Sequence, residues 1–265
     1  MTLPPIIRKD LSHSIRQLSL YYHYPIWLNS LLLAAASRLN FSNKTRFYQL
    51  IRTFFDIIRK NSQNSRNMQN KTQNITAVIL AGGEGTRLSG LDKGLVKLNN
   101  KPLVQHLIER IKPQVSHIMI SANRNIGSYK KFGLPVFKDS VNDFAGPLAG
   151  ILKALQESQT EWILSVPADS PFISTNLVSR LSENIKDNKV VIPDDGKYLH
   201  PTFALIHKSL AASLEGFLQQ GERKARVWMQ QQKHKIVDFS DQAEAFMNIN
   251  TQEELQHAEQ HFSKL

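Results

Sequence analysis

From residue 75 onward, short apolar runs alternate with amphipathic stretches. Residues 75–80, ITAVIL, have the length and composition of a strand that is buried on both faces. Similar runs predict further strands at residues 117–122, 135–138, 162–166, 189–192, 202–206, 236–239 and 246–249. The stretches between and after them predict helices at residues 102–111, 126–132, 146–155, 222–232 and 251–262. Because helices between strands are the crossovers of a parallel sheet, we predict an α/β fold with a doubly wound, Rossmann-like, mostly parallel sheet.

Residues 1–74 differ from the rest of the chain in charge and pattern. They hold eleven Lys and Arg against two acidic residues, a net charge of +9, whereas the remaining 191 residues hold 22 against 20, a net of +2. Residues 44–60 place apolar side chains three and four apart with cations between them, which predicts an amphipathic helix. This helix either docks on a membrane surface or a partner or packs on its own neighbours, and the second is favoured because such helices are far commoner. Residues 61–74 are rich in Asn, Gln and Ser and have no apolar period, which predicts a linker.

We therefore predict a basic helical extension with its linker at residues 1–74 and a catalytic domain at residues 75–265. The domain is long enough to fold by itself, and Met68 lies seven residues before the first strand. Residues 1–67 are either an appendage or upstream coding sequence read into the frame, and we expect them to be dispensable for catalysis.

The apolar stretch within residues 24–39 is too short and too polar to span a membrane, and the region before it is too long for a signal peptide. The absence of cysteine excludes a disulfide framework and any thiolate site. The excess positive charge belongs to the extension, so it says little about the partners of the domain. We expect a cytoplasmic protein without stable membrane insertion and without a nucleic-acid partner.

A glycine-rich loop follows the first strand, within ITAVILAGGEGTRLSGLDK at residues 75–93. Gly82 and Gly83 lack the Cβ atoms that keep a ligand from the backbone, so N–H groups can turn onto an anion. Arg87 can bind two phosphate oxygens at once and Lys93 adds a point charge, which suits a triphosphate. The loop is neither a P-loop, which requires Gly-Lys-Ser/Thr, nor a complete dinucleotide fingerprint, whose third glycine is replaced by leucine. The glycines alone fit an ordinary tight turn equally well.

Polar residues follow three later strands, and in an open α/β sheet ligands collect at the carboxyl ends of strands. Ser121, Asp139 and Asp169 occupy these positions. Proteins usually hold Mg²⁺ through one or two carboxylates plus substrate phosphates, so Asp169 fits a metal ligand and Asp139 a nucleotide contact or a second carboxylate. Each aspartate could instead cap the following helix. For Asp139, the residues alone favour the capping role.

The string LAGGEGTRLSGLDK, from Leu80 to Lys93, resembles the signature of the nucleotidyltransferase family that includes molybdenum cofactor guanylyltransferase and, more distantly, the sugar-1-phosphate nucleotidylyltransferases. The Asp-Lys-Gly at residues 92–94 is similar to the molybdenum cofactor branch, because sugar enzymes usually have Pro-Lys there. Further matches between residues 121 and 255 are SANR, DS, GPLAG, PADSPFI, HPTFAL, GERK and NINTQEEL. The resemblance implies the nucleotide-diphospho-sugar transferase type of sheet. It also implies transfer of GMP from GTP to the terminal phosphate of molybdenum-molybdopterin, with Mg²⁺ and release of pyrophosphate.

The resemblance further implies roles for individual residues. The predicted GTP contacts are Leu80, Ala81, Gly82, Gly83, Lys93, Ser121, Asp139 and Asp169. Asp169 matches the metal position, and with Arg87 and Lys93 it completes the predicted catalytic set. Ser121 departs from the family, which commonly has asparagine there. A hydroxyl cannot offer both the donor and the carbonyl acceptor of an amide, so this guanosine-side contact is weaker or is supplied by Asn123 or by main chain.

Two other functions stay open at this point. One is sugar-1-phosphate or cytidylyl transfer on the same fold, since sugar enzymes also use the GEGTRL form of the loop. The other is an inactive nucleotide-binding accessory protein that docks through its basic helices, although a pure binder has no need of a metal carboxylate. The expected partners are GTP and molybdopterin, with transient contacts to molybdoenzyme maturation proteins. We expect His106 and His200 to have structural roles. His200 is also a candidate for lining the part of the site that binds the pterin.

Overall fold

The computed structural model describes residues 74–81, 92–138 and 146–262, together with four isolated positions, Gln49, Leu50, Thr53 and Asp56. The chain divides into two units, Met1–Asn67 and Met68–Leu265. Apart from those four positions, which are helical, the amphipathic helix predicted at residues 44–60 lies outside the described residues, as does the linker up to residue 73. In the part of the chain that the structure describes, no helix combines the length and the apolar character needed to cross a membrane.

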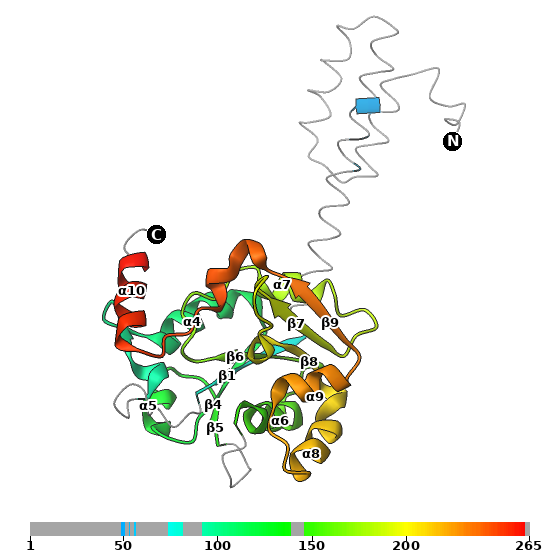
Figure 1. The fold of residues 1–265 in the computed structure, drawn as a ribbon, viewed down its shortest axis with the longest axis horizontal. Helices are drawn as coiled ribbons and strands as arrows, with labels where there is room; N and C mark the ends of the chain where they lie inside the picture. The colour runs from blue at the N-terminus through cyan, green and yellow to red at the C-terminus, as the bar shows by residue number, and fades with distance from the viewer. Residues whose placement is uncertain are drawn as a thin grey trace, which may run out of the picture. The chain divides into compact units, whose positions relative to one another are not determined.

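A seven-stranded sheet forms the centre of the second unit (Figure 1), in the order β5-β4-β1-β6-β8-β7-β9. Its strands are β1 (Ile75–Leu80), β4 (His117–Ser121), β5 (Val136–Phe137), β6 (Trp162–Pro167), β7 (Val190–Asp194), β8 (Leu205–His207) and β9 (His234–Asp238). Only β8 is antiparallel to its neighbours, β6 and β7. The predicted mostly parallel sheet is confirmed.

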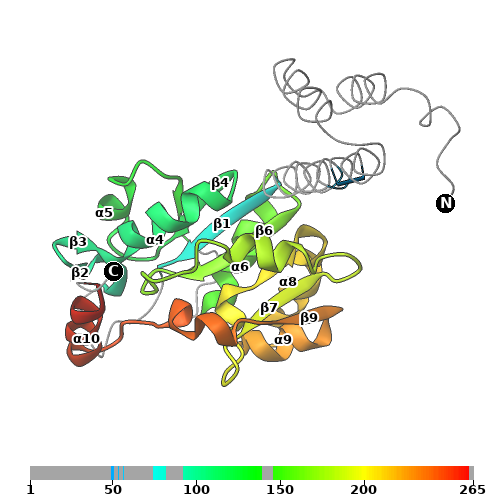
Figure 2. The same cartoon turned by 90° about the horizontal axis from the view of Figure 1, so that it is seen from above.

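Helices cover both faces of the sheet (Figures 1 and 2). The helices are α4 (Leu103–Ile111), α5 (Ile126–Lys130), α6 (Pro147–Glu157), α7 (Leu177–Ser182), α8 (Ala211–Gln219), α9 (Ala225–Gln231) and α10 (Gln252–Phe262). Ala77 and Ile79 of β1 share a buried cluster with residues of α4, α5 and α7, whereas Val78 belongs to a cluster with α6, α8 and α9. Successive side chains of a strand point to opposite faces, and both faces of β1 are covered. This double burial explains why the β1 sequence is apolar almost throughout.

A small two-stranded sheet, β2 (Lys97–Leu98) and β3 (Lys101–Pro102), packs near α10 (Figure 2). Asn99 and Asn100 form the tight turn between its strands with positive φ angles of 49° and 64°, a backbone conformation that asparagine tolerates well. Leu98 shares a third buried cluster with Phe172, from the loop after β6, and with Leu255 of α10. This cluster brings the C-terminal helix to the carboxyl side of the main sheet.

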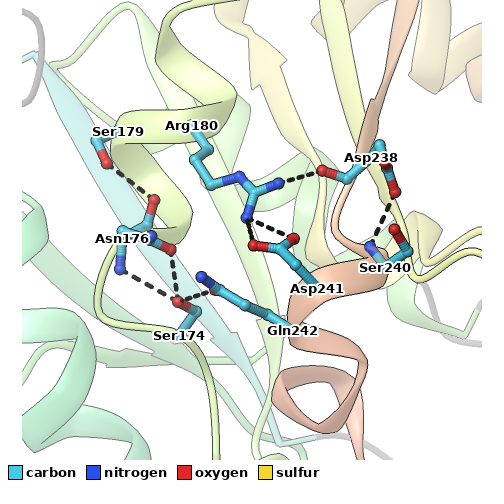
Figure 3. Close-up of polar contacts among 8 residues, drawn as sticks. All are labelled: Ser174, Asn176, Ser179, Arg180, Asp238, Ser240, Asp241 and Gln242. Atoms are coloured by element: carbon cyan, nitrogen blue, oxygen red, sulfur yellow. Dashed lines mark hydrogen bonds and ion pairs between the residues drawn. The ribbon is translucent and has the colours of Figure 1, made fainter.

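Arg180 of α7 holds the segment that follows β9 (Figure 3). Its Nη1 donates to both carboxylate oxygens of Asp241 at 2.9 Å, and its Nη2 donates to the carbonyl oxygen of Asp238. Nearby, the Ser174 hydroxyl donates to Oε1 of Gln242 at 2.6 Å. These bonds attach the chain between β9 and α10 to α7 and to the loop before it. That loop and the chain after β9 both continue to the site described below.

Some sequence predictions were wrong. The strand predicted at residues 246–249 does not form: Phe246 ends a 3-10 helix, η7 (Ser240–Phe246), and the residues after it join no sheet. The helices α7 and α8 were not predicted, and the helix predicted from Pro102 begins one residue later, at Leu103. An apolar pattern indicates that side chains are buried. It does not show that the backbone forms hydrogen bonds with a neighbouring strand.

Candidate active site

The carboxyl ends of three central strands lie at one level. Leu80 of β1 is in register with Ser121 of β4 on one side and with Pro167 of β6 on the other. After β1, the chain first adds β4 and β5 on one side of β1 and then adds β6 and the later strands on its other side. The direction in which strands are added therefore reverses between β1 and β6. Open α/β sheets bind ligands outside the carboxyl ends of strands at such a switch point. Leu80, Ala81, Ser121 and Asp169 therefore share one edge, since Ala81 is the first residue after β1 and Asp169 the second residue after β6.

Apart from Lys93, the remaining predicted site residues lie outside the described residues. Gly82, Gly83 and Arg87 belong to residues 82–91, and Asp139 to residues 139–145. Their assigned roles remain predictions.

Lys93 and Asp169 come together across this edge. Lys93 begins a 3-10 helix, η3 (Lys93–Leu95), and its Nζ lies 3.6 Å from Oδ2 of Asp169. The same Nζ donates to Oδ1 of Asn250 at 2.5 Å. Burial raises the pKa of Asp169, and the charge of Lys93 offsets part of that effect. The two side chains remain 29% and 14% exposed, so a ligand from solvent can reach both.

Asn250 was not predicted as a site residue, and a capping box places it. The Glu254 carboxylate accepts the backbone N–H groups of Asn250 and Thr251 at 2.5 and 3.0 Å, and the Thr251 hydroxyl accepts the N–H of Glu254 at 3.1 Å. The pattern Thr-x-x-Glu before α10 is the sequence signature of this motif. That signature locates the start of α10 and puts Asn250 just before it, but it gives no sign of the contact with Lys93.

Two hydrogen bonds tie the loop after β6 to the segment that carries Asn250. Ser170, whose side chain is fully buried, donates from Oγ to Oδ1 of Asn248 at 2.6 Å. The backbone N–H of Ile249 donates to the carbonyl oxygen of Asp169 at 3.0 Å. The backbone that carries Asp169 is therefore fixed to the same segment that holds the Lys93 ammonium.

Ser121 lies against α6, where the helix approaches the strand ends closely. A Cβ atom on Gly150 would lie 2.6 Å from Oγ of Ser121 and 3.0 Å from Cδ2 of Leu80. Real Cβ atoms do not come so close to such neighbours, so α6 reaches this position only because residue 150 has no side chain.

We expect Gly150→Ala to lower the free energy of unfolding by about 1–3 kcal/mol, because the added methyl overpacks the contact between α6 and the strand ends. Gly216→Ala in α8 is the matched control, since a Cβ there meets no atom within 4 Å. It should leave stability unchanged or raise it by about 0.5–1 kcal/mol. Denaturant unfolding of both variants measures the difference, and equal stabilities would contradict the packing described.

The two histidines considered above have internal partners. His106 is buried, and its Nε2 lies 2.9 Å from the carbonyl oxygen of Leu98, a contact that links α4 to β2. Nε2 of His200 lies 2.8 Å from Oδ2 of Asp195, and its ring stacks on Phe246 with centroids 4.5 Å apart. These contacts give both rings a structural role.

The described residues contain no group of three or more His, Cys, Asp and Glu side chains that could enclose a metal ion. Asp169 supplies a mostly buried carboxylate beside the place where phosphates are expected. Such a donor fits Mg²⁺, because proteins usually bind this ion through one or two carboxylates plus substrate phosphates and water.

Comparison with known proteins identifies the family. Residues 77–236 match the model of the MobA-like NTP transferase domain. The molybdenum cofactor guanylyltransferase of Vibrio parahaemolyticus is 46% identical over 179 residues, which are 67% of this chain and 91% of that protein. The protein of the same name from Shewanella pealeana is 44% identical over 184 residues, 69% of this chain and 92% of that protein. Among solved structures, molybdopterin-guanine dinucleotide biosynthesis protein A from Archaeoglobus fulgidus is similar with a TM-score of 0.61 and 26% identity, covering 72% of this chain and 100% of that one. The chain belongs to the family of MobA-like NTP transferases.

Proposed function

We propose that this chain transfers GMP from GTP to the terminal phosphate of molybdenum-molybdopterin, forming the guanine dinucleotide form of the molybdenum cofactor. The observation that carries the proposal is the approach of Lys93 to Asp169, 3.6 Å apart, at the carboxyl ends of the central strands. A cation for phosphates and a carboxylate for their metal ion are the two groups that this reaction needs side by side. The guanylyltransferases that are 44–46% identical to this chain support the choice of GTP and molybdopterin.

The reaction is an in-line displacement at phosphorus. An oxygen of the molybdopterin phosphate forms a bond to the α-phosphorus of GTP, and the bond from that phosphorus to the oxygen bridging to the β-phosphate breaks. Pyrophosphate leaves with the bonding electrons. The attacking phosphate is already anionic at neutral pH, so no general base is required, and catalysis consists of positioning and charge stabilisation.

Each assigned residue contributes to that positioning. Arg87 and Lys93 hold the β- and γ-phosphates and stabilise the pyrophosphate as it departs. Asp169 is the residue that would hold Mg²⁺, and Asp139 adds a contact to the nucleotide. Mg²⁺, when bound, supplies positive charge that neutralises the phosphates. Before nucleotide binds, Asp169 and Asn250 keep the Lys93 ammonium at the edge of the sheet.

Pyrophosphate release from GTP with Mg²⁺ and molybdenum-loaded molybdopterin tests the proposed function directly. Calorimetric binding of GTP, ATP, CTP and UTP in Mg²⁺ tests the choice of nucleotide. A preference for CTP or UTP would favour cytidylyl or sugar-1-phosphate transfer instead. Nucleotide binding without any release of pyrophosphate would favour an accessory protein.

We also propose that catalysis is confined to residues 75–265, that it takes place in the cytoplasm, and that the protein makes transient contacts with molybdoenzyme maturation proteins. A truncated chain that begins at Met68 should match the full chain in melting temperature and in pyrophosphate release. We expect this because residues 1–74 carry a net charge of +9 and residues 75–265 one of only +2, and because residues 61–74 have the polar composition of a linker. If the truncated chain precipitates or loses several degrees of stability, the extension is part of the fold and the proposed boundary is wrong.

A further inference from the structure

Asp92, the residue before Lys93, connects η3 to α5. The Tyr129 hydroxyl donates to Oδ1 of Asp92 at 2.5 Å, and Nδ2 of Asn125 donates to its Oδ2 at 3.2 Å. Aspartate at the start of a helix commonly accepts a backbone N–H as a cap. Asp92 stands at that position of η3, yet its side chain makes no capping hydrogen bond. Its carboxylate instead holds this short helix against α5.

The Tyr129 hydroxyl also lies against the residue on the other side of Lys93. A Cβ on Gly94 would be 2.6 Å from Oη of Tyr129 and 3.0 Å from Cβ of Ala168, the residue before the metal-site aspartate. The chain on both sides of Lys93 therefore rests on one buried tyrosine. Burial and the hydrogen bond to Asp92 raise the pKa of Tyr129, so the hydroxyl keeps its proton as a donor.

We propose that Tyr129 and Asn125, acting through Asp92, are positioning residues that fix Lys93 for transfer of the nucleotide. Lysine carries its charge on a flexible four-carbon side chain. The contacts of its Nζ with Asp169 and Asn250 can set the position of the charge only if its backbone is held as well. The hydrogen bonds of the Asp92 carboxylate with Tyr129 and Asn125 hold the backbone beside Lys93 and so supply this anchor. This inference rests on the guanylyl transfer proposed above.

Tyr129→Phe tests the anchor because it removes the hydroxyl and keeps the ring. We expect turnover in the pyrophosphate-release assay to fall about 10- to 100-fold, since misplacing a positioned group by about 1 Å can cost ~10² in rate. The same substitution in Lys93→Ala protein should change turnover less than about twofold, because the group that it positions is already gone. A hydroxyl that only stabilises the fold would lower the activity of both backgrounds by the same factor, and that result would overturn the proposal.

Ser182→Ala is the matched control. It also removes a buried hydroxyl, which donates to the carbonyl oxygen of Val178 at 2.6 Å within α7. Its turnover should equal that of the parent protein in both backgrounds. If Tyr129→Phe fails to fold, Asp92→Ala removes the same anchor from a half-buried position, and its loss of activity should likewise depend on Lys93.

The experiments distinguish failure of the proposed function from failure of the positioning role. Wild-type protein that binds GTP but releases no pyrophosphate overturns the proposed function. Wild-type protein that releases pyrophosphate, with unchanged turnover in folded Tyr129→Phe and Asp92→Ala, overturns the positioning role alone.

Discussion

Asp169→Asn is expected to slow pyrophosphate release by ~10²–10³-fold, the usual effect of removing one positioned electrostatic group. The amide keeps the shape of the carboxylate but loses the charge assigned to hold Mg²⁺, and it leaves Lys93 without its anionic partner. The fold should persist, because the hydrogen bond from Ile249 reaches the main-chain carbonyl of residue 169 and not its side chain. The melting temperature should therefore change little while turnover falls.

Turnover measured over a range of Mg²⁺ concentrations, beside the melting temperature, checks this expectation. Asp241→Asn is a matched control, because it makes the same chemical change at the ion pair with Arg180. The control should retain its turnover. Near-normal activity of Asp169→Asn at saturating Mg²⁺ would refute the metal assignment.

Lys93→Ala should weaken both GTP binding and turnover, because an ammonium that holds phosphates contacts them in the ground state and in the transition state. A hydrogen bond to a charged group contributes about 1.5–3 kcal/mol. We therefore expect the Kd for GTP to rise roughly 10- to 150-fold and turnover to fall as well. Removing Lys93 also removes the positive charge that offsets the effect of burial on the pKa of Asp169.

Calorimetry with GTP and Mg²⁺ measures the change in affinity. Lys101→Ala is the control, since it deletes an exposed lysine whose Nζ pairs with Glu109 at 2.8 Å. That variant should bind GTP like wild type. Unchanged GTP affinity of Lys93→Ala would contradict the assigned phosphate contact.

The order of helices and strands along the chain was largely predictable from the sequence. The strands β1 and β6 were recognised because nearly all their residues are buried and apolar, and β4 because its centre is apolar. α7 was missed because its six residues are too few to show a helical period. α8 did carry a signal, with Leu214, Phe217 and Leu218 at helical spacing on its buried side. The pattern at residues 246–249 was apolar for another reason, since these side chains pack against His200 and the loop after β6 while the backbone joins no sheet.

The sequence by itself determined which groups are available for chemistry: a glycine-rich turn after a buried strand, two cations near it, and Asp169 at the end of another strand. Local rules sufficed here, because apolar runs, turn residues and helix caps can be recognised from neighbouring residues in the chain. Only the tertiary structure decided that Asn250 meets Lys93, 157 residues away, and that Tyr129 meets Asp92, 37 residues away. Each contact joins segments whose meeting depends on the order of strands in the sheet and on the packing of the chain around it. No local pattern specifies that order, because it follows from the burial of the whole core.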